Sequence, residues 1–322
     1  MSEPWNLPER EVTPEKVVVS RRRWLKAAGL GALAVGGGGA AWWHWLRPGS
    51  DKEVLGTTLA NAPAKDLYPA ARSDRFAEVD RPLTKEVEAA RYTNFYEFAG
   101  TKNVWNYIDA FQPVPWAVEV TGLVAKPRTY DIDDLVRAFP LEERVYRHRC
   151  VETWAMAVPW TGFPLSALLR SAEPLPAARF VRFVSFDNPR QARRQSDRSQ
   201  PWPYTEGLTL DEATNELAFI ATGMYGHPLL KQHGAPVRLV VPWKYGFKSA
   251  KSIVRVELTD RQPATFWNTI SPHEYDFSAN VNPDVPHPRW PQHTETMLGT
   301  EEPRPTQLYN GYGEWVAKLY KT

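Results

Sequence analysis

Hydrophobic and polar residues recur along residues 84–258 at spacings that predict strands and short helices in irregular alternation. Alternating apolar positions indicate strands at residues 114–124, 144–150, 178–186, 217–222, 237–241 and 253–258. Helical spacing indicates short helices at residues 84–92, 132–139, 163–171 and 210–213. Because no βαβ unit repeats with a regular period of about 30 residues, the pattern argues against a doubly wound sheet. We predict an α+β fold with mixed β-sheets and short helices.

The first 46 residues have the pattern of an export leader. Residues 20–26 read Ser-Arg-Arg-Arg-Trp-Leu-Lys, a twin-arginine pattern, and an uncharged stretch of Ala, Gly, Leu and Val follows at residues 27–41. The glycine run at 36–39 would cost about 1 kcal/mol per residue in a helix interior, which disfavours a surface helix. We expect export of the folded protein to the periplasm. Because tryptophans extend the apolar stretch to Leu46, both a cleaved leader and a retained anchor stay open.

Composition adds limits on size and partners. The chain has 322 residues, 43% of them hydrophobic, so it can bury a sizeable core. Its formal net charge of +2 arises from 39 basic and 37 acidic residues, which gives no electrostatic footprint for nucleic acid. Residues 47–92 are polar and irregular and predict an extended surface segment, and residues 93–322 predict the catalytic domain.

Cys150 is the only cysteine in the chain, whereas exported proteins ordinarily use cysteines in pairs. Its neighbours Arg147, His148 and Arg149 bring three potentially cationic side chains within three positions. Such a setting favours the thiolate, which is both a nucleophile and a soft metal ligand. The alternative is a buried cysteine that behaves as an inert small hydrophobe. We expect the chemistry of the protein to centre on Cys150.

Familiar catalytic patterns do not account for this cysteine. The sequence has no G-x-S-x-G elbow, no H-E-x-x-H motif, no P-loop and no G-x-G-x-x-G after a predicted strand. Its seven histidines are scattered, and no pair has compact zinc-ligand spacing. What remains is one sulfur ligand and several segments rich in Gly, Arg and Lys. That combination suits a cofactor that brings most of its own ligands.

Several long motifs resemble the sulfite oxidase fold of molybdenum enzymes. Residues 146–154, Tyr-Arg-His-Arg-Cys-Val-Glu-Thr-Trp, and residues 158–165, Val-Pro-Trp-Thr-Gly-Phe-Pro-Leu, resemble its molybdenum-binding segment. Within that fold the sequence is most similar to the catalytic subunits of periplasmic protein-methionine-sulfoxide reductase systems. Segments 94–98, 234–238, 241–248, 280–283 and 287–290 agree with that family. The resemblance runs from the twin-arginine leader to the C-terminal region.

The resemblance implies one molybdenum–molybdopterin cofactor per chain. Cys150 would be the catalytic residue and the protein's metal ligand. The positions that match the pterin- and phosphate-binding residues of the family are Asn94, Tyr96, Glu97, Ser185, His233, Arg238, Ser249, Ala250 and Lys251. Arg forks, Lys charge and free backbone N–H groups are the partners that a phosphate needs.

The sequence departs from the family pattern at three places. Thr93 stands where the family often has a second Asn, His233 replaces an Asn before Gly234, and Ser185 replaces a common Thr. Thr93 and His233 keep the capacity to hydrogen bond but lose the amide geometry, whereas Ser185 keeps the hydroxyl. The contacts made by Thr93 and His233 are therefore expected to differ from those of the family.

The activity implied by the resemblance is reduction of methionine sulfoxide in oxidised periplasmic proteins. The chain has no C-x-x-C-H haem motif and no iron–sulfur cysteines, so electrons must come from a partner. In the family this partner is a haem-containing membrane protein that oxidises quinols. Three alternatives stay open: sulfite oxidation or reduction of small S- or N-oxides on the same cofactor, a metal-free acyl transfer with Cys150 as nucleophile and His148 as base, and a pure binding module.

Overall fold

The computed structural model describes residues 50–59 and 61–320, so the predicted leader lies outside the described residues. The stretch up to residue 92 holds two short helices, α3 (Asp51–Leu55) and α4 (Glu86–Arg91), joined by irregular chain and 3-10 turns. A capping box begins α3, because the Ser50 hydroxyl accepts from the Glu53 N–H while the Glu53 carboxylate accepts from the Ser50 N–H. Val54 and Phe76 of this stretch are buried, so it also contributes to the core.

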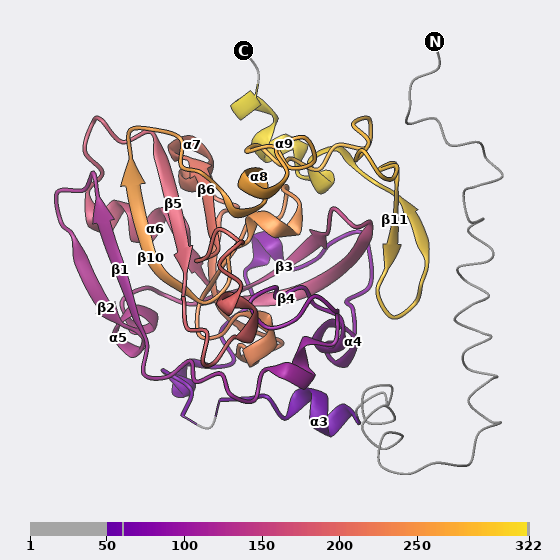
Figure 1. The fold of residues 1–322 in the computed structure, drawn as a ribbon, viewed down its shortest axis with the longest axis horizontal. Helices are drawn as coiled ribbons and strands as arrows, with labels where there is room; N and C mark the ends of the chain where they lie inside the picture. Colours follow the sequence, from indigo (N-terminus) through magenta and orange to yellow (C-terminus); the bar gives the residue numbers. More distant parts are fainter. Residues whose placement is uncertain (1–49, 60, 321–322) are drawn as a thin grey trace. The chain divides into compact units, whose positions relative to one another are not determined.

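One sheet has five strands in the order β2-β1-β10-β5-β6. The pair of β1 and β10 is parallel and the other pairs are antiparallel. In Figure 1 the strands β1, β10, β5 and β6 of this sheet lie side by side, with α5 and α6 close to them. The bounds of these elements are β1 (Ala117–Gly122), β2 (Arg128–Asp131), β5 (Phe180–Ser185), β6 (Thr205–Thr209), β10 (Ile253–Thr259), α5 (Ile132–Arg137), α6 (Leu165–Ala172) and α7 (Leu210–Thr214).

The second sheet is built around β4, whose ten residues 154–163 are all buried. β4 pairs with β3 and β7 in antiparallel fashion and with β11 in parallel. Its elements are β3 (Glu142–Arg149), β4 (Trp154–Pro164), β7 (Phe219–Met224), β8 (His227–Pro228), β9 (Arg238–Val240), β11 (Thr294–Met297) and β12 (Pro303–Pro305). Two further short helices are α8 (Phe266–Ile270) and α9 (Gly313–Val316).

The predicted α+β class with mixed sheets is confirmed, and each predicted strand and helix has an observed counterpart at overlapping positions. The sequence reading missed β2, β4, β6, β8, β11, β12, α3, α8 and α9. β4 is the most consequential of these. It contains Pro159 and is buried throughout its first ten residues, so it lacks the alternation that marks a half-exposed strand.

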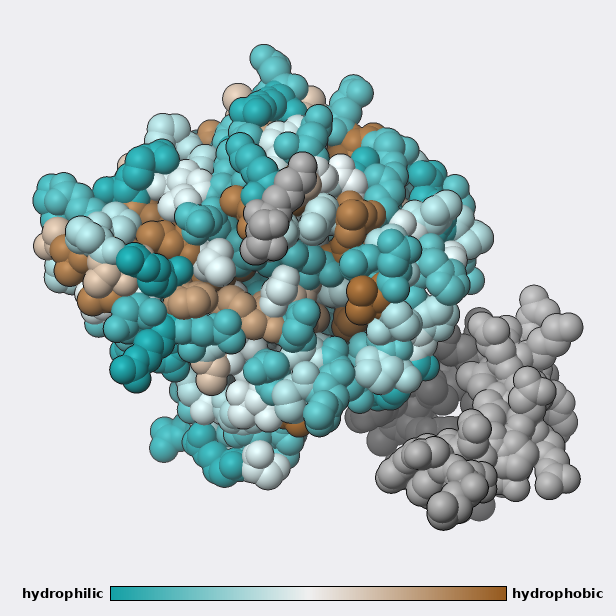
Figure 2. Space-filling model, turned by 90° about the horizontal axis from the view of Figure 1, so that it is seen from above, coloured by the Kyte–Doolittle hydropathy of each residue, from teal (hydrophilic) through white to brown (hydrophobic). Residues whose placement is uncertain are grey.

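The described residues show no broad apolar face on the side that Figure 2 presents. In Figure 2 hydrophobic residues lie interspersed among hydrophilic ones on the side that is visible. The large hydrophobic side chains that are exposed among the described residues are Leu83, Leu175, Ile270, Val285 and Leu308, with exposed fractions between 39% and 59%. Within residues 50–59 and 61–320 we find no helix with the length and hydrophobicity of a membrane span.

Candidate active site

Cys150 lies in the tight turn that joins β3 to β4. The turn is closed by the Cys150 N–H, which donates to the Trp154 carbonyl at 2.9 Å, and by the Thr153 N–H, which donates to the Cys150 carbonyl at 3.0 Å. Thr153 has a φ of 73°, a left-handed conformation that costs a non-glycine residue on the order of 1–3 kcal/mol. The turn therefore holds Cys150 in a fixed position at the ends of two core strands.

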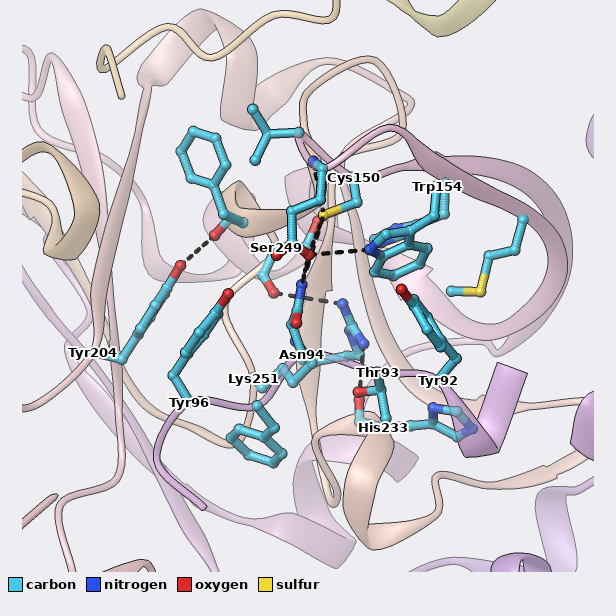
Figure 3. Close-up of a pocket in the computed structure, with 18 of the residues that line it drawn as sticks. Tyr92, Thr93, Asn94, Tyr96, Cys150, Trp154, Tyr204, His233, Ser249 and Lys251 are labelled. Atoms are coloured by element: carbon cyan, nitrogen blue, oxygen red, sulfur yellow. Dashed lines mark hydrogen bonds between the residues drawn. The ribbon is translucent and has the colours of Figure 1, made fainter. Parts of the chain in front are cut away.

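Eight of the ten predicted site residues, Cys150 among them, line one pocket (Figure 3). They come from separate segments: the stretch after α4, the β3–β4 turn, the 3-10 turn that ends at His233, the start of β9, and the loop after the 3-10 turn Gly246–Lys248. These residues are Asn94, Tyr96, Glu97, Cys150, His233, Arg238, Ser249 and Lys251. The fold thus brings together the only thiol of the chain and a cluster of cationic side chains.

Ser185 and Ala250 do not line the pocket. The Ser185 hydroxyl donates to the Lys251 carbonyl at 2.7 Å, and the buried Ala250 accepts at its carbonyl from the Leu239 N–H at 2.9 Å. Both residues hold the loop that carries Lys251. Gly234 is needed beside it, because its φ is 93° and a Cβ there would lie 2.6 Å from the Lys251 side chain.

The expectation that basic neighbours make Cys150 a thiolate is wrong for the cofactor-free chain. Arg147 pairs with Asp80, and the Arg149 side chain points into the core, away from the pocket. Burial raises the pKa of the Cys150 thiol to about 12, and the charge of Glu152 adds to this effect. Burial also lowers the pKa of His148 to about 3, so it is neutral at physiological pH. A thiol this weakly acidic and a histidine this weakly basic argue against the metal-free nucleophile.

A polar cluster around the carboxylate of Glu152 lies beside the sulfur, and the sequence did not predict it. Asn94 Nδ2 lies 3.6 Å from Cys150 Sγ and donates to Glu152 Oε2 at 2.8 Å. Glu152 also pairs with Lys102 and accepts from Trp154 Nε1 at 3.2 Å. Burial raises the pKa of Glu152, but the hydrogen bonds from Asn94 and Lys102 outweigh it and hold the pKa below its ordinary value. Glu152 stands in the cysteine motif and could have been suspected, whereas no sequence signal points to Lys102.

The part of the pocket formed by Arg238, Lys251 and His233 has more positive than negative charge. Arg238 is 3% exposed, stacks over the Trp160 ring at 4.8 Å and donates to the His233 carbonyl at 2.9 Å. Among the described residues neither Arg238 nor Lys251 has a carboxylate within ion-pair distance. His233 Nε2 is buried and has no hydrogen-bond partner in this part of the chain. Burial lowers the pKa of Arg238 to about 9 and lowers that of Lys251 as well.

Buried cations without a carboxylate partner are energetically unfavourable until an anion enters the pocket. Glu97 lies in the same pocket, but burial raises its pKa, so it only partly compensates the cations. An anionic group would satisfy Arg238, Lys251 and the free nitrogen of His233 together. The pocket therefore combines a soft metal ligand in one part with an anion-binding part in the other.

Comparisons with known proteins place this geometry in a family. Residues 106–267 match the family model described as oxidoreductase molybdopterin binding domain. The chain is 45% identical over 325 residues to the protein-methionine-sulfoxide reductase catalytic subunit MsrP of Ralstonia nicotianae, covering 98% of this chain and 94% of the relative. This chain belongs to that family. It is also 45% identical over 323 residues to the same subunit of Burkholderia mallei, covering 98% of this chain and 93% of the relative.

Among solved structures, the sulfane dehydrogenase SoxCD from Paracoccus pantotrophus is similar, with a TM-score of 0.43 and 16% identity. The match covers 92% of this chain and 67% of that chain.

The residues of the pocket fit the molybdenum–molybdopterin cofactor of the family. Cys150 can supply the protein sulfur, because a coordinated thiol is deprotonated by the metal despite a raised pKa. Arg238, Lys251 and His233 can hold the phosphate of the pterin. Their unpaired charge and the free His233 nitrogen are the observations that support this fit.

His233 gives a prediction for the cofactor-free protein. Burial lowers its pKa from 6.5 to about 3 in the folded state, so between these values the unfolded chain binds more protons. Stability attributable to His233 is therefore complete above pH 6.5 and is lost as pH falls, at about 1.4 kcal/mol per pH unit. Urea unfolding at pH 6.5 and 5.0 should show that His233→Asn loses about 1.6 kcal/mol less than the wild type. Equal losses in both proteins would contradict the buried, neutral histidine.

Proposed function

We propose that this chain is the catalytic subunit of a periplasmic system that reduces methionine sulfoxide residues in proteins to methionine. The observation that carries the proposal is the full-length relationship to the reductase catalytic subunits together with the pocket that joins Cys150 to a cationic cradle. In the net reaction the sulfoxide loses its oxygen, and two electrons and two protons convert that oxygen to water.

Different residues of the chain have different roles in this reaction. When bound, the molybdenum cofactor supplies two-electron oxygen-atom transfer. Arg238, Lys251 and His233 would hold the phosphate of the cofactor, and Cys150 would supply the protein sulfur ligand to the metal. Asn94 lies within 3.6 Å of the sulfur and orients Glu152, whose carboxylate is charged and lies beside the same sulfur. This polar cluster can hold and pass protons near the reacting sulfoxide.

Electrons must come from a partner, since the single cysteine of the chain leaves no iron–sulfur ligands and the sequence has no haem motif. We propose a haem-containing, quinol-oxidising membrane subunit as that donor. The name of the related proteins, catalytic subunit, supports a multi-subunit system. The twin-arginine pattern supports export of the folded, cofactor-loaded chain to the periplasm.

The test uses the natively exported holoprotein with reduced benzyl viologen as electron donor. A protein oxidised at its methionines should recover methionine, detected by mass spectrometry, together with oxidation of the viologen dye. The same protein without sulfoxide is the control and should consume no dye. Sulfite with an artificial acceptor is the competing assay. Sulfite turnover faster than sulfoxide reduction would overturn the proposal.

A further inference from the structure

A buried ionic network lies directly behind the Cys150 turn, outside the pocket. Glu295 on β11 stands between two guanidinium groups, pairing with Arg81 through Oε1 and with Arg149 through Oε2, which lies 3.2 Å from Arg149 Nε. The side chains of Arg81, Arg149 and Glu295 are only 2%, 0% and 1% exposed. None of the three lines the pocket.

This network is connected to the backbone that carries the sulfur. Arg149 Nη1 donates to the Cys150 carbonyl, and Arg149 Nη2 donates to Gln292 Oε1 at 2.8 Å. Gln292 Nε2 in turn donates to the Val151 carbonyl at 2.8 Å, as does Trp290 Nε1. Trp290 and Gln292 thus hold the Val151 carbonyl, and Arg149, which is bonded to Gln292, holds the preceding carbonyl of Cys150.

The Arg149 guanidinium is the centre of this arrangement, because its planar fork can make several hydrogen bonds at fixed angles. Its orientation depends on Glu295, the one carboxylate that compensates both buried arginines within the described residues. Removing that charge would leave Arg149 buried without a carboxylate partner, while Arg81 would keep only Asp80, and the Arg149 fork would be free to turn. The position of the Cys150 carbonyl, and with it of Sγ, would then no longer be fixed.

We propose that Glu295, Arg149 and Arg81 are positioning residues that set the direction of the Cys150 sulfur toward the molybdenum. They act through the backbone of the turn and not by contact with the cofactor. The proposal rests on Cys150 as the metal ligand, which is part of the proposed function, but not on which sulfoxide is reduced. Through Glu295, β11 would take part in positioning the metal ligand Cys150.

The test compares Glu295→Gln with a matched control in the holoprotein. The substitution keeps the shape of the side chain and removes its charge. Glu143→Gln is the control, because Glu143 lies near the far end of β3 and pairs with Arg72. We expect Glu295→Gln to shift the electron paramagnetic resonance signal of Mo(V) and to lower kcat about 10- to 100-fold with little change in KM, the range typical of lost support around a metal ligand. Glu143→Gln should leave both unchanged.

Gln292→Met is a second, gentler variant, because it breaks the link between Arg149 and Val151 without changing buried charge. It should shift the Mo(V) signal in the same direction and keeps the test decisive if Glu295→Gln fails to fold. A wild-type Mo(V) signal in whichever of these variants binds molybdenum would overturn the proposal. Since this signal does not depend on the substrate, its outcome is separate from a failure of sulfoxide reduction.

Discussion

Replacing Cys150 with serine is expected to abolish sulfoxide reduction while leaving the fold nearly intact. A hydroxyl is a poor substitute for a soft thiolate ligand. Loss of a residue that merely supports a metal ligand costs about 10- to 100-fold, so loss of the ligand itself should exceed about 100-fold. The loss is measured as kcat with reduced benzyl viologen and methionine sulfoxide, and circular dichroism reports the fold. Full activity in Cys150→Ser would contradict the assignment of the metal ligand.

Substitution of Cys150 would abolish activity whether this cysteine is a metal ligand or a free nucleophile. Alkylation of the thiol distinguishes the two roles. In the holoprotein Cys150 should resist iodoacetamide, since a coordinated sulfur is protected. The same protein unfolded in urea with a chelator should take up one equivalent, at its single cysteine. Rapid labelling of the cofactor-loaded protein would favour the nucleophile.

Replacing Arg238 with alanine is expected to weaken retention of the cofactor. Arg238 is buried in the pocket, stacks on Trp160 and has no carboxylate partner among the described residues, so its charge is available for the phosphate. A hydrogen bond to a charged group contributes about 1.5–3 kcal/mol, which corresponds to roughly 10- to 150-fold weaker binding. Molybdenum content after extended dialysis, measured by mass spectrometry of the metal, should fall accordingly.

Arg144→Ala is the matched control for this loss. Arg144 is also buried, and it stacks on Phe76 and Phe219, but it does not line the pocket. Its removal should lower stability and leave the molybdenum content of the folded protein unchanged. Equal molybdenum content in Arg238→Ala and the wild type would show that the phosphate does not bind at Arg238.

The sequence predicted those strands in which hydrophobic and polar residues alternate because one face of the strand is buried and the other is more exposed. β1, for example, buries Val118 and Val120 while the residues between and around them are more exposed. β4 was missed because its first ten residues are all buried, so nothing distinguishes one face of the strand from the other. β11 was missed because Glu295, a buried charge, stands where a hydrophobic residue would have marked the inner face.

The site was predictable as far as its residues stand in recognisable motifs, which is the case for Cys150, Arg238 and Lys251. The charge state of the thiol was not, because counting basic neighbours ignores where their side chains point. Successive side chains of a strand face opposite sides, so His148 turns to the pocket while Arg149 turns to the core. The pair of Lys102 and Glu152 joins residues 50 positions apart and needed the structure.

The protonated, buried state of the thiol has a consequence for biogenesis. Coordination requires the sulfur to give up its proton, so insertion of the cofactor releases acid and should be easier at higher pH. Before that moment the sulfur is a weak target for oxidants and alkylating agents, because these react with the thiolate. The Cys150 thiol of a newly made chain therefore stays unmodified until the cofactor is inserted.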